Sequence, residues 1–156
     1  MQAQHVVILL GGDLGDPLAA LEHAERAVAG NIGQVLARSR DHWTEPWGFR
    51  STTLFLNRAL LVSTELPLPV VLERSLAIEQ RLGRVRSVAS TPTSRVIDID
   101  ILAAGNAVID THRLVVPHPR LPMRRFALAP LCDIAPGWLH PTLQRTALDL
   151  LNSVPR

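Results

Sequence analysis

The stretch Ser94-Arg95-Val96-Ile97-Asp98-Ile99-Asp100-Ile101-Leu102 combines a row of isoleucines with two acidic side chains. Side chains of an extended strand alternate between its two faces, so the three isoleucines point to one side and the two aspartates to the other. The isoleucine row can enter a hydrophobic core, which leaves the carboxylates together on the opposite face. The stretch therefore predicts a half-buried strand that presents two acids.

Asp98 and Asp100 are candidate ligands of a cation. Their Cα atoms lie roughly 6.5–7 Å apart in an extended chain, so the two negative charges repel each other. A hard divalent cation that prefers oxygen ligands, above all Mg²⁺, relieves this repulsion. An amphipathic edge strand with a merely solvated polar face is the alternative interpretation of so short a motif.

Length and composition indicate one globular domain. The 156 residues are 47% hydrophobic and 19% charged, and we expect residues 1–156 to form a single domain around one core. No run of eighteen apolar residues occurs and the first residues carry no basic segment, so we expect no membrane association and no cleaved signal peptide. The single cysteine, Cys132, cannot form an intrachain disulfide, and its apolar neighbours favour a buried thiol. These features predict a cytoplasmic protein.

All sixteen basic residues are arginine, and tyrosine is absent. The sequence pI near 9.9 therefore reflects the lack of groups that titrate between histidine and arginine, because the net charge is only +2. The aromatic-basic run of RNA-binding sheets is missing, so we expect no nucleic-acid partner. The guanidinium group suits bidentate contact with phosphate, and seven arginines flank the acidic strand. They are Arg84, Arg86, Arg95, Arg113, Arg120, Arg124 and Arg125.

Acidic residues that hold Mg²⁺, surrounded by guanidinium groups, fit a polyphosphate substrate. The chain contains no GxxxxGK[ST] motif and no lysine to complete one, which excludes a P-loop enzyme. The histidines show no HxxxH or HExxH spacing for zinc. His118, between two prolines, is a candidate hydrogen-bond donor to a phosphate, or else a structural histidine at a strand end.

The apolar periodicity predicts the order strand, helix, strand, strand, helix, strand. The expected elements are a strand over 6–10, a helix from Pro17 to about residue 28 with Asp16 as N-cap, strands over 35–43 and 55–64, a helix over 67–82, and the acidic strand. This is the split βαβ order of a ferredoxin-like α+β sandwich, which has two layers and a mostly antiparallel sheet. Further along we expect a short strand near 108–109 and helices near 126–132 and 143–151.

Aromatic residues gather where a flat substrate could stack. Trp43, Trp47, Phe49 and Phe55 lie in or beside one loop, and Phe126 follows the basic stretch. Two aromatic faces can hold a flat heterocycle between them, although core packing explains each residue taken separately.

Together these pieces resemble the 6-hydroxymethyl-7,8-dihydropterin pyrophosphokinase family from about residue 5 to residue 150. The quoted acidic stretch resembles the family's signature. The other matching motifs, in order, are Gly11-Gly12-Asp13-Leu14-Gly15-Asp16, Thr44-Glu45-Pro46-Trp47-Gly48 with Phe55-Leu56-Asn57, Gly83-Arg84-Val85-Arg86, Leu114-Val115-Val116-Pro117-His118-Pro119-Arg120-Leu121 and Ile134-Ala135-Pro136. Each motif alone is weak evidence for the family, whereas the ordered set of motifs is highly specific for it.

The resemblance implies that the protein transfers pyrophosphate from ATP to the hydroxymethyl group of the pterin, with AMP as the leaving group. It implies two Mg²⁺ ions on Asp98 and Asp100. The catalytic arginines would be Arg84, Arg86 and Arg95. ATP would contact Glu79, Ile101, Arg113, His118 and Arg124, and the pterin would contact Thr44, Trp47, Gly48, Phe55, Asn57 and Phe126.

The substrates implied by the resemblance are ATP and hydroxymethyldihydropterin, and we expect a monomer. The second hypothesis is a catalytically weak module of the same fold that binds ATP without completing the pterin site.

Overall fold

The computed structural model describes residues 2–45, 54–83 and 96–155. Within these residues, the main sheet has the strand order β2-β4-β1-β5, and β3 pairs with β4 as well. All of these pairings are antiparallel. The strands are β1 (Gln4–Gly12), β2 (Gln34–Arg38), β3 (His42–Thr44), β4 (Phe55–Thr64) and β5 (Asp98–Ala103).

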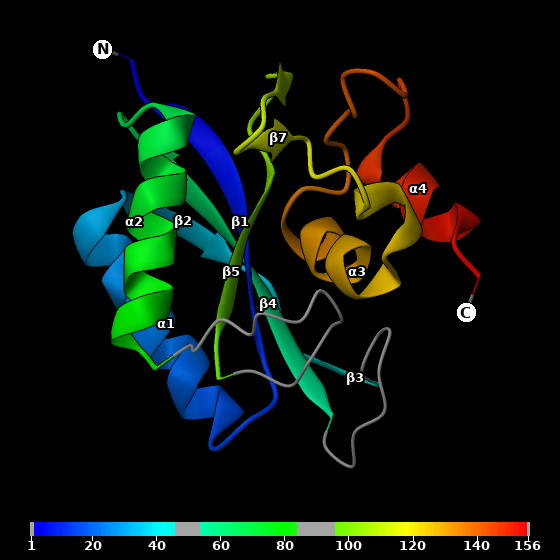
Figure 1. Ribbon diagram of the computed structural model, residues 1–156. Coiled ribbons are helices and arrows are strands. Elements are labelled where there is room, and N and C mark those ends of the chain that lie inside the picture. The colour runs from blue at the N-terminus through cyan, green and yellow to red at the C-terminus, as the bar shows by residue number, and fades with distance from the viewer. Residues whose placement is uncertain (1, 46–53, 84–95, 156) are drawn as a thin grey trace.

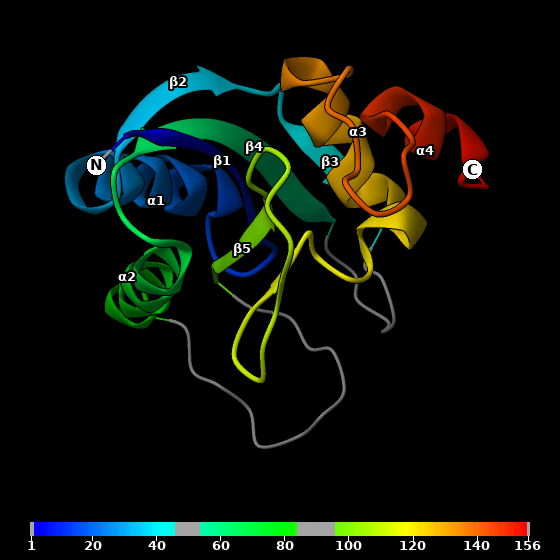
Figure 2. The same ribbon diagram turned by 90° about the horizontal axis from the view of Figure 1, so that it is seen from above.

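Helices cover both faces of this sheet (Figures 1 and 2). The helices α1 (Pro17–Asn31) and α2 (Leu68–Arg81) lie on one face, and α3 (Arg125–Ile134) and α4 (Ala147–Ser153) lie beside the other. A small hairpin of β6 (Ile109–Asp110) and β7 (Val115–Val116) follows β5, and a 3₁₀ turn covers Leu121–Met123. Among the described residues, no helix has the length and apolar character needed to cross a bilayer.

The ferredoxin-like prediction is confirmed, because the β1-α1-β2-β4-α2-β5 order produces an antiparallel sheet with α1 and α2 on one face. The C-terminal helices add a layer that the two-layer prediction does not include. The sheet therefore has an apolar core on each face, one under α1 and α2 and the other under α3 and α4.

Strand β5 has the predicted alternation of faces. Ile97, Ile99 and Ile101 are each at most 5% exposed and pack in the core under α1 and α2. Asp98 and Asp100 are half-buried on the other face, where Leu102 joins the core under α3 and α4. The position of the acidic pair therefore follows from the burial of the isoleucines.

The predicted start of α1 is also confirmed. The Asp16 carboxylate accepts a hydrogen bond from the Ala19 amide at 3.1 Å, and Pro17 occupies the first helical position. This side chain satisfies one of the amides that a helix leaves unpaired at its N-terminus.

The single strand predicted over 35–43 is wrong, because the structure divides it into β2 and β3. A register irregularity lies between Val35 and Ala37. At Ser39 the hydroxyl, rather than a backbone carbonyl, accepts the hydrogen bond of the Ala59 amide at 2.8 Å. The apolar pattern cannot reveal this replacement, because the chain still follows β4 on both sides of the break.

The last helix begins at Ala147, later than the predicted residue 143. Thr146 is its N-cap, and its hydroxyl accepts from the Asp149 amide at 3.1 Å. The preceding residues instead form a turn in which the His140 Nδ1 lies within hydrogen-bond distance of the Thr142 and Leu143 amides.

Cys132 in α3 is half-buried. Burial, followed by the charge of Asp133, raises the pKa of its thiol, which agrees with a structural role.

Two glycines near the end of α1 provide a matched test of the packing of this helix against β4. A Cβ at Gly33 would lie 2.1 Å from the Ser63 carbonyl oxygen, whereas a Cβ at Gly30 would meet nothing within 4 Å. We expect Gly33→Ala to lower the free energy of unfolding by about 2 kcal/mol. Gly30→Ala should raise it by about 0.5 kcal/mol, because alanine favours the helix. Urea unfolding measures both values, and equal effects of the two substitutions would contradict the described contact.

Candidate active site

Alternation along three neighbouring strands brings polar residues together on the α3 side of the sheet. Gly11 of β1 lies opposite Asn57 of β4 on one side and opposite Asp98 of β5 on the other. Phe55 and Asp100 share this face by the period of two. Farther along the same face, α3 and α4 cover the apolar core. The polar group therefore continues the α3 side of the sheet beyond the apolar core.

Three carboxylates gather at the start of β5. The Glu79 side chain of α2 is 2% exposed, and its Oε2 accepts a hydrogen bond from the Ile99 amide at 2.7 Å. Burial raises the pKa of Asp100 well above the usual range, and the charges of Asp98 and Glu79 raise it further. The positive charge of Arg124 opposes this effect only in part. The acids thus carry a repulsion that a cation would relieve.

Asp98 and Asp100 fit Mg²⁺ by their chemistry. Mg²⁺ is commonly held by one or two carboxylates, with waters and substrate phosphates completing its coordination. No cage of three or more histidine, cysteine or acidic ligands is found within the described ranges. Two carboxylates whose mutual repulsion Arg124 opposes only in part therefore suit an open Mg²⁺ site, completed by water and phosphate, better than a closed structural site.

Basic groups face the acids from the loop after β7 and from α3. Burial lowers the pKa of His118 to about 4, assisted by the positive charges of Arg124 and Arg120, so the imidazole is neutral at pH 7. The Arg120 amide donates to the His118 Nδ1 at 3.2 Å. The proton of the neutral ring is therefore assigned to Nε2, which can donate to a phosphate oxygen.

The predicted pterin contacts in the described chain lie on β3, β4 and α3. The Asn57 Nδ2 donates to the Thr44 hydroxyl at 3.4 Å, and Asn57 is 2% exposed. Phe55 lies opposite Thr44 in the sheet, and Phe126 is half-buried near the start of α3. A Cβ on Gly11 would lie 2.8 Å from the Asn57 Oδ1 and 3.2 Å from the Phe55 ring, so glycine at this position leaves room for both side chains.

Three of the predicted ATP contacts also have contacts within the protein. The Ile101 side chain is in the core under the helices, so a nucleoside could meet only its backbone. Glu79 likewise directs one oxygen to β5. Arg113 is exposed and lies 4.0 Å from Glu73 of α2. Five of the predicted site residues lie outside the described residues, namely Trp47, Gly48, Arg84, Arg86 and Arg95.

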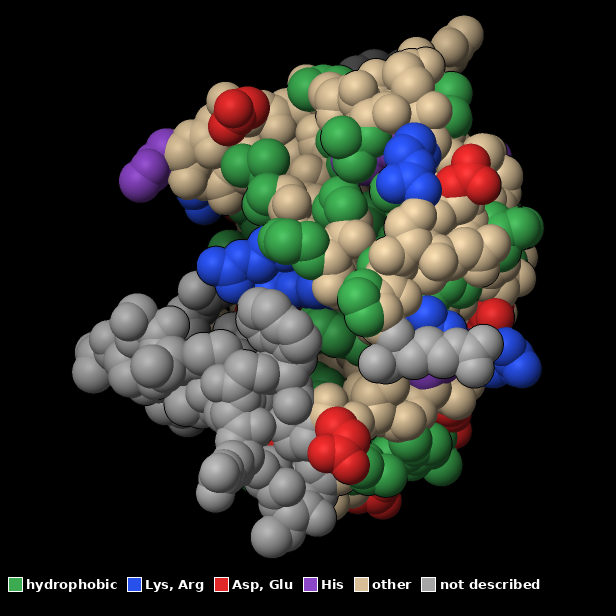
Figure 3. Space-filling model, turned by 90° about the vertical axis from the view of Figure 1, so that its right-hand side faces the viewer, with side chains coloured by type: hydrophobic (Ala, Val, Ile, Leu, Met, Phe, Trp, Pro, Cys, Tyr) green, Lys and Arg blue, Asp and Glu red, His purple; other side chains and the backbone are tan. Residues whose placement is uncertain are grey.

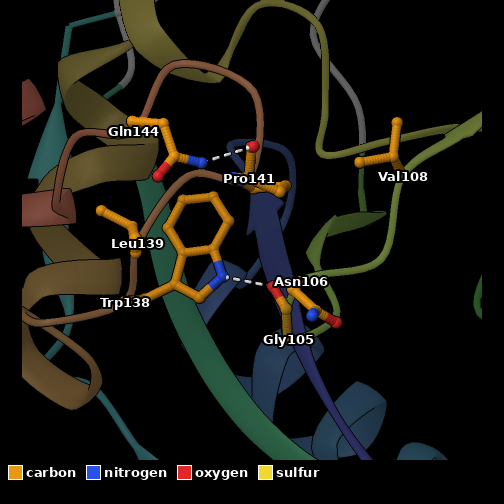
Figure 4. A pocket seen from close by; sticks show the side chains of 7 residues that line it. All are labelled: Gly105, Asn106, Val108, Trp138, Leu139, Pro141 and Gln144. Atoms are coloured by element: carbon orange, nitrogen blue, oxygen red, sulfur yellow. Dashed lines mark hydrogen bonds between the residues drawn. The ribbon is translucent and has the colours of Figure 1, made fainter.

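A hollow of about 550 Å³ lies near the end of β5 that is farther from Asp98 (Figure 4). The Trp138 Nε1 donates to the Gly105 carbonyl oxygen at 2.8 Å, and the Gln144 Nε2 donates to the Pro141 carbonyl oxygen at 2.7 Å. Gly105 follows Asp98 by seven residues, roughly 20 Å along an extended strand. This hollow is therefore separate from the acidic pair. Both hydrogen bonds join residues of its own lining.

The fold, together with two aspartates that face basic residues, indicates a class of protein, an α+β enzyme with a polyphosphate substrate. Comparison with known proteins identifies the family. The family model of 7,8-dihydro-6-hydroxymethylpterin-pyrophosphokinase (HPPK) matches residues 7–136. The chain belongs to this family.

Two curated relatives agree with this assignment. A 2-amino-4-hydroxy-6-hydroxymethyldihydropteridine pyrophosphokinase of Methylorubrum extorquens is 45% identical over 128 residues, which cover 81% of this chain and 80% of the relative. The enzyme of the same name from Porphyromonas gingivalis is 39% identical over 138 residues, covering 87% of this chain and 93% of the relative.

Solved structures support the fold alone. An HPPK-DHPS crystallised with substrates aligns with a TM-score of 0.77 at 15% identity, over 98% of this chain. Wild-type Plasmodium falciparum HPPK-DHPS with SDX-DHP gives a TM-score of 0.78 at 16% identity, over 97% of this chain. The chain spans 43% and 44% of those longer proteins.

The acidic pair yields a prediction that needs no activity assay. Because the pKa of Asp100 is raised in the folded state, this group contributes most to stability at low pH, and the contribution is lost as the pH rises from about 4 through the folded pKa. In EDTA at about pH 8, Asp100→Asn should therefore raise the melting temperature. The difference should shrink towards about pH 4.

Adding Mg²⁺ should raise the melting temperature of the wild type and not that of Asp100→Asn. Asp110→Asn, at an exposed acid of β6, is the matched control and should change neither measurement. A wild type that melts at the same temperature with and without Mg²⁺, together with a destabilised Asp100→Asn, would show that the carboxylate pair is not a cation site.

Proposed function

We propose that the acidic pair, the basic residues around His118 and the polar end of the sheet together form the active site of a pyrophosphokinase. As a member of this family, the protein transfers pyrophosphate from ATP to the hydroxymethyl group of 6-hydroxymethyl-7,8-dihydropterin, a step of folate synthesis. The observation that carries the residue assignment is the position of Asp98 beside Gly11, which in turn lies beside Asn57.

In this proposal Asp98 and Asp100 would hold two Mg²⁺ ions. The metal ions supply neutralisation of phosphate charge. The protein itself supplies orientation, which is the main demand of phosphoryl-type transfer. Glu79 supports the pair through the Ile99 amide between the two aspartates.

His118 and Arg124 would complete the phosphate side of the site. The neutral imidazole offers the Nε2 proton as a hydrogen-bond donor, and the Arg124 guanidinium offers a fixed positive charge. We assign Arg113 to the nucleotide as well, and Arg84, Arg86 and Arg95 to the reacting phosphates by family resemblance. None of these groups needs to form a covalent bond with the substrate.

The pterin slot, defined as Thr44, Phe55, Asn57 and Phe126, would hold the second substrate, with Trp47 and Gly48 assigned to it by resemblance. Phe55 and Phe126 supply apolar ring faces, and Asn57 supplies amide donors and an acceptor for the polar edge of a pterin. The slot is next to the acidic pair because β4 and β5 both flank β1. This order of strands supports a site in which the pterin hydroxyl group would lie near the nucleotide phosphates.

We further propose that residues 1–156 act as one domain, as a cytoplasmic monomer. ATP as co-substrate and the single half-buried cysteine support a reducing, nucleotide-rich compartment. An ATP-binding module without catalysis gains no support from the family comparison.

The direct test is the product of the reaction. We expect AMP to form when the protein is mixed with ATP, Mg²⁺ and hydroxymethyldihydropterin, and not when the pterin is omitted. Asp98→Ala and Asp100→Ala should each lower the turnover by at least about a hundredfold, because each removes a metal-binding oxygen donor. Formation of ADP, or nucleotide turnover that ignores the pterin, would overturn the proposal.

Gly11 offers a finer test of the slot. Gly11→Ala places a methyl group against Asn57 and Phe55, whose side chains must then move by a few tenths of an ångström. We expect the KM for the pterin to rise by about tenfold and the KM for ATP by less than twofold, as measured by AMP formation. Gly30→Ala is the control, because its methyl group meets nothing. A selective rise in the KM for ATP would place the pterin elsewhere.

A further inference from the structure

The segment that joins β2 to β3 follows β4 but is held largely by side chains. The Ser39 hydroxyl accepts from the Ala59 amide at 2.8 Å. The Asp41 carboxylate accepts from the Arg58 guanidinium at 2.7 and 3.1 Å, on the side where Arg58 also reaches Glu25 of α1. Strand β3 has only three residues, so these side-chain contacts carry much of its placement.

Asp133, in the last turn of α3, receives hydrogen bonds from the opposite side of the same segment. The Arg40 amide donates to it at 3.1 Å, and the Arg40 guanidinium donates at 3.1 and 3.3 Å. The His42 Nε2 lies 2.8 Å from the same carboxylate. One carboxylate thus joins a helix to two alternate residues of a segment more than 90 positions away in sequence.

This contact differs from an ordinary surface ion pair. The side chains of Asp133 and His42 are only 16% and 19% exposed, although Arg40 is 81% exposed. Burial alone would raise the pKa of Asp133, but the hydrogen bonds from Arg40 and His42 lower it overall. A sheltered carboxylate with several donors, one of them a backbone amide, fixes geometry better than two exposed side chains do.

The two sides of this contact belong to elements that also carry residues of the pterin slot. Phe126 and Asp133 are seven residues apart in α3, two turns along one face of the helix. His42 lies opposite Asn57, and Thr44 lies opposite Phe55, in the register of β3 with β4. His42 and Thr44 share a face of β3 by the period of two. The carboxylate therefore connects the helix that carries one wall of the slot to the strand that carries the other.

We propose that Asp133 is a positioning residue that holds β3 against α3 and so sets the separation between the two walls of the pterin slot. The inference rests on the proposed function, because it takes Thr44, Asn57 and Phe126 as pterin contacts. Asp133 acts through His42 and Arg40 and needs no contact with either substrate. Its effect belongs to pterin binding and leaves the nucleotide site unchanged.

The test separates the two substrates by steady-state AMP formation. For Asp133→Ala we expect the KM for the pterin to rise by about tenfold, while the KM for ATP and the kcat at saturating pterin change by less than twofold. His42→Ala should raise the KM for the pterin by about threefold, because Arg40 still reaches the carboxylate. Asp133→Asn, which keeps one acceptor oxygen, should recover part of the loss. Asp149→Ala, at an exposed acid of α4, should match the wild type.

Equal losses in pterin binding, ATP binding and kcat would show a general structural role and overturn the inference, as would an unchanged KM for the pterin. If Asp133→Ala does not fold, His42→Ala decides by the same criteria. Asn57→Ala separates this inference from the proposed function. If Asn57→Ala raises the KM for the pterin and Asp133→Ala does not, only the positioning role fails. If Asn57→Ala has no effect, the slot assignment fails.

Discussion

The crowding of three carboxylates at the start of β5 is the constraint on which the site depends. Glu79 bonds the Ile99 amide from the α2 side, while Asp98 and Asp100 stand on the other face of the same strand. The buried isoleucines fix this strand against α1 and α2, so the two aspartates stay together on its other face. The protein therefore keeps like charges close together, and on the proposed assignment a cation bound with the nucleotide would relieve their repulsion.

Much of the fold could be predicted from local sequence, because alternation and helix signals act over a few residues. Strand β5 and the Asp16 cap of α1 are of this kind. The break between β2 and β3 could not be predicted, since it depends on the Ser39 hydroxyl bonding a residue twenty positions away. The late start of α4 depends on Thr146 as its cap. The helices α3 and α4 have local signals, but their packing as a layer on the second face of the sheet has none, because it depends on contacts with distant strands.

The site also contains residues that local sequence predicts and residues that it does not. Asp98 and Asp100 can be found from spacing alone, and the remaining candidates on β4 and α3 follow from ordered motifs rather than from geometry. The contact between Asp133 and His42 has no such signal, because its partners come from separate segments with no shared period. The burial of Ile101 follows directly from the period of two. The lowered pKa of His118 depends on its burial and on the nearby Arg124, which only the folded chain reveals.

The start of α3 carries the Arg124 guanidinium 5.4 Å from the centre of the Phe126 ring. On the side of the molecule where α3 and α4 lie, hydrophobic side chains are interspersed with basic and acidic ones (Figure 3). On the proposed assignment, one short piece of backbone thus serves both the nucleotide and the pterin. A substitution selected to exclude a pterin analogue at Phe126 would also disturb the cation over its ring. Resistance to such an inhibitor would therefore carry a cost in nucleotide use, and the two substrate preferences could not evolve independently at this position.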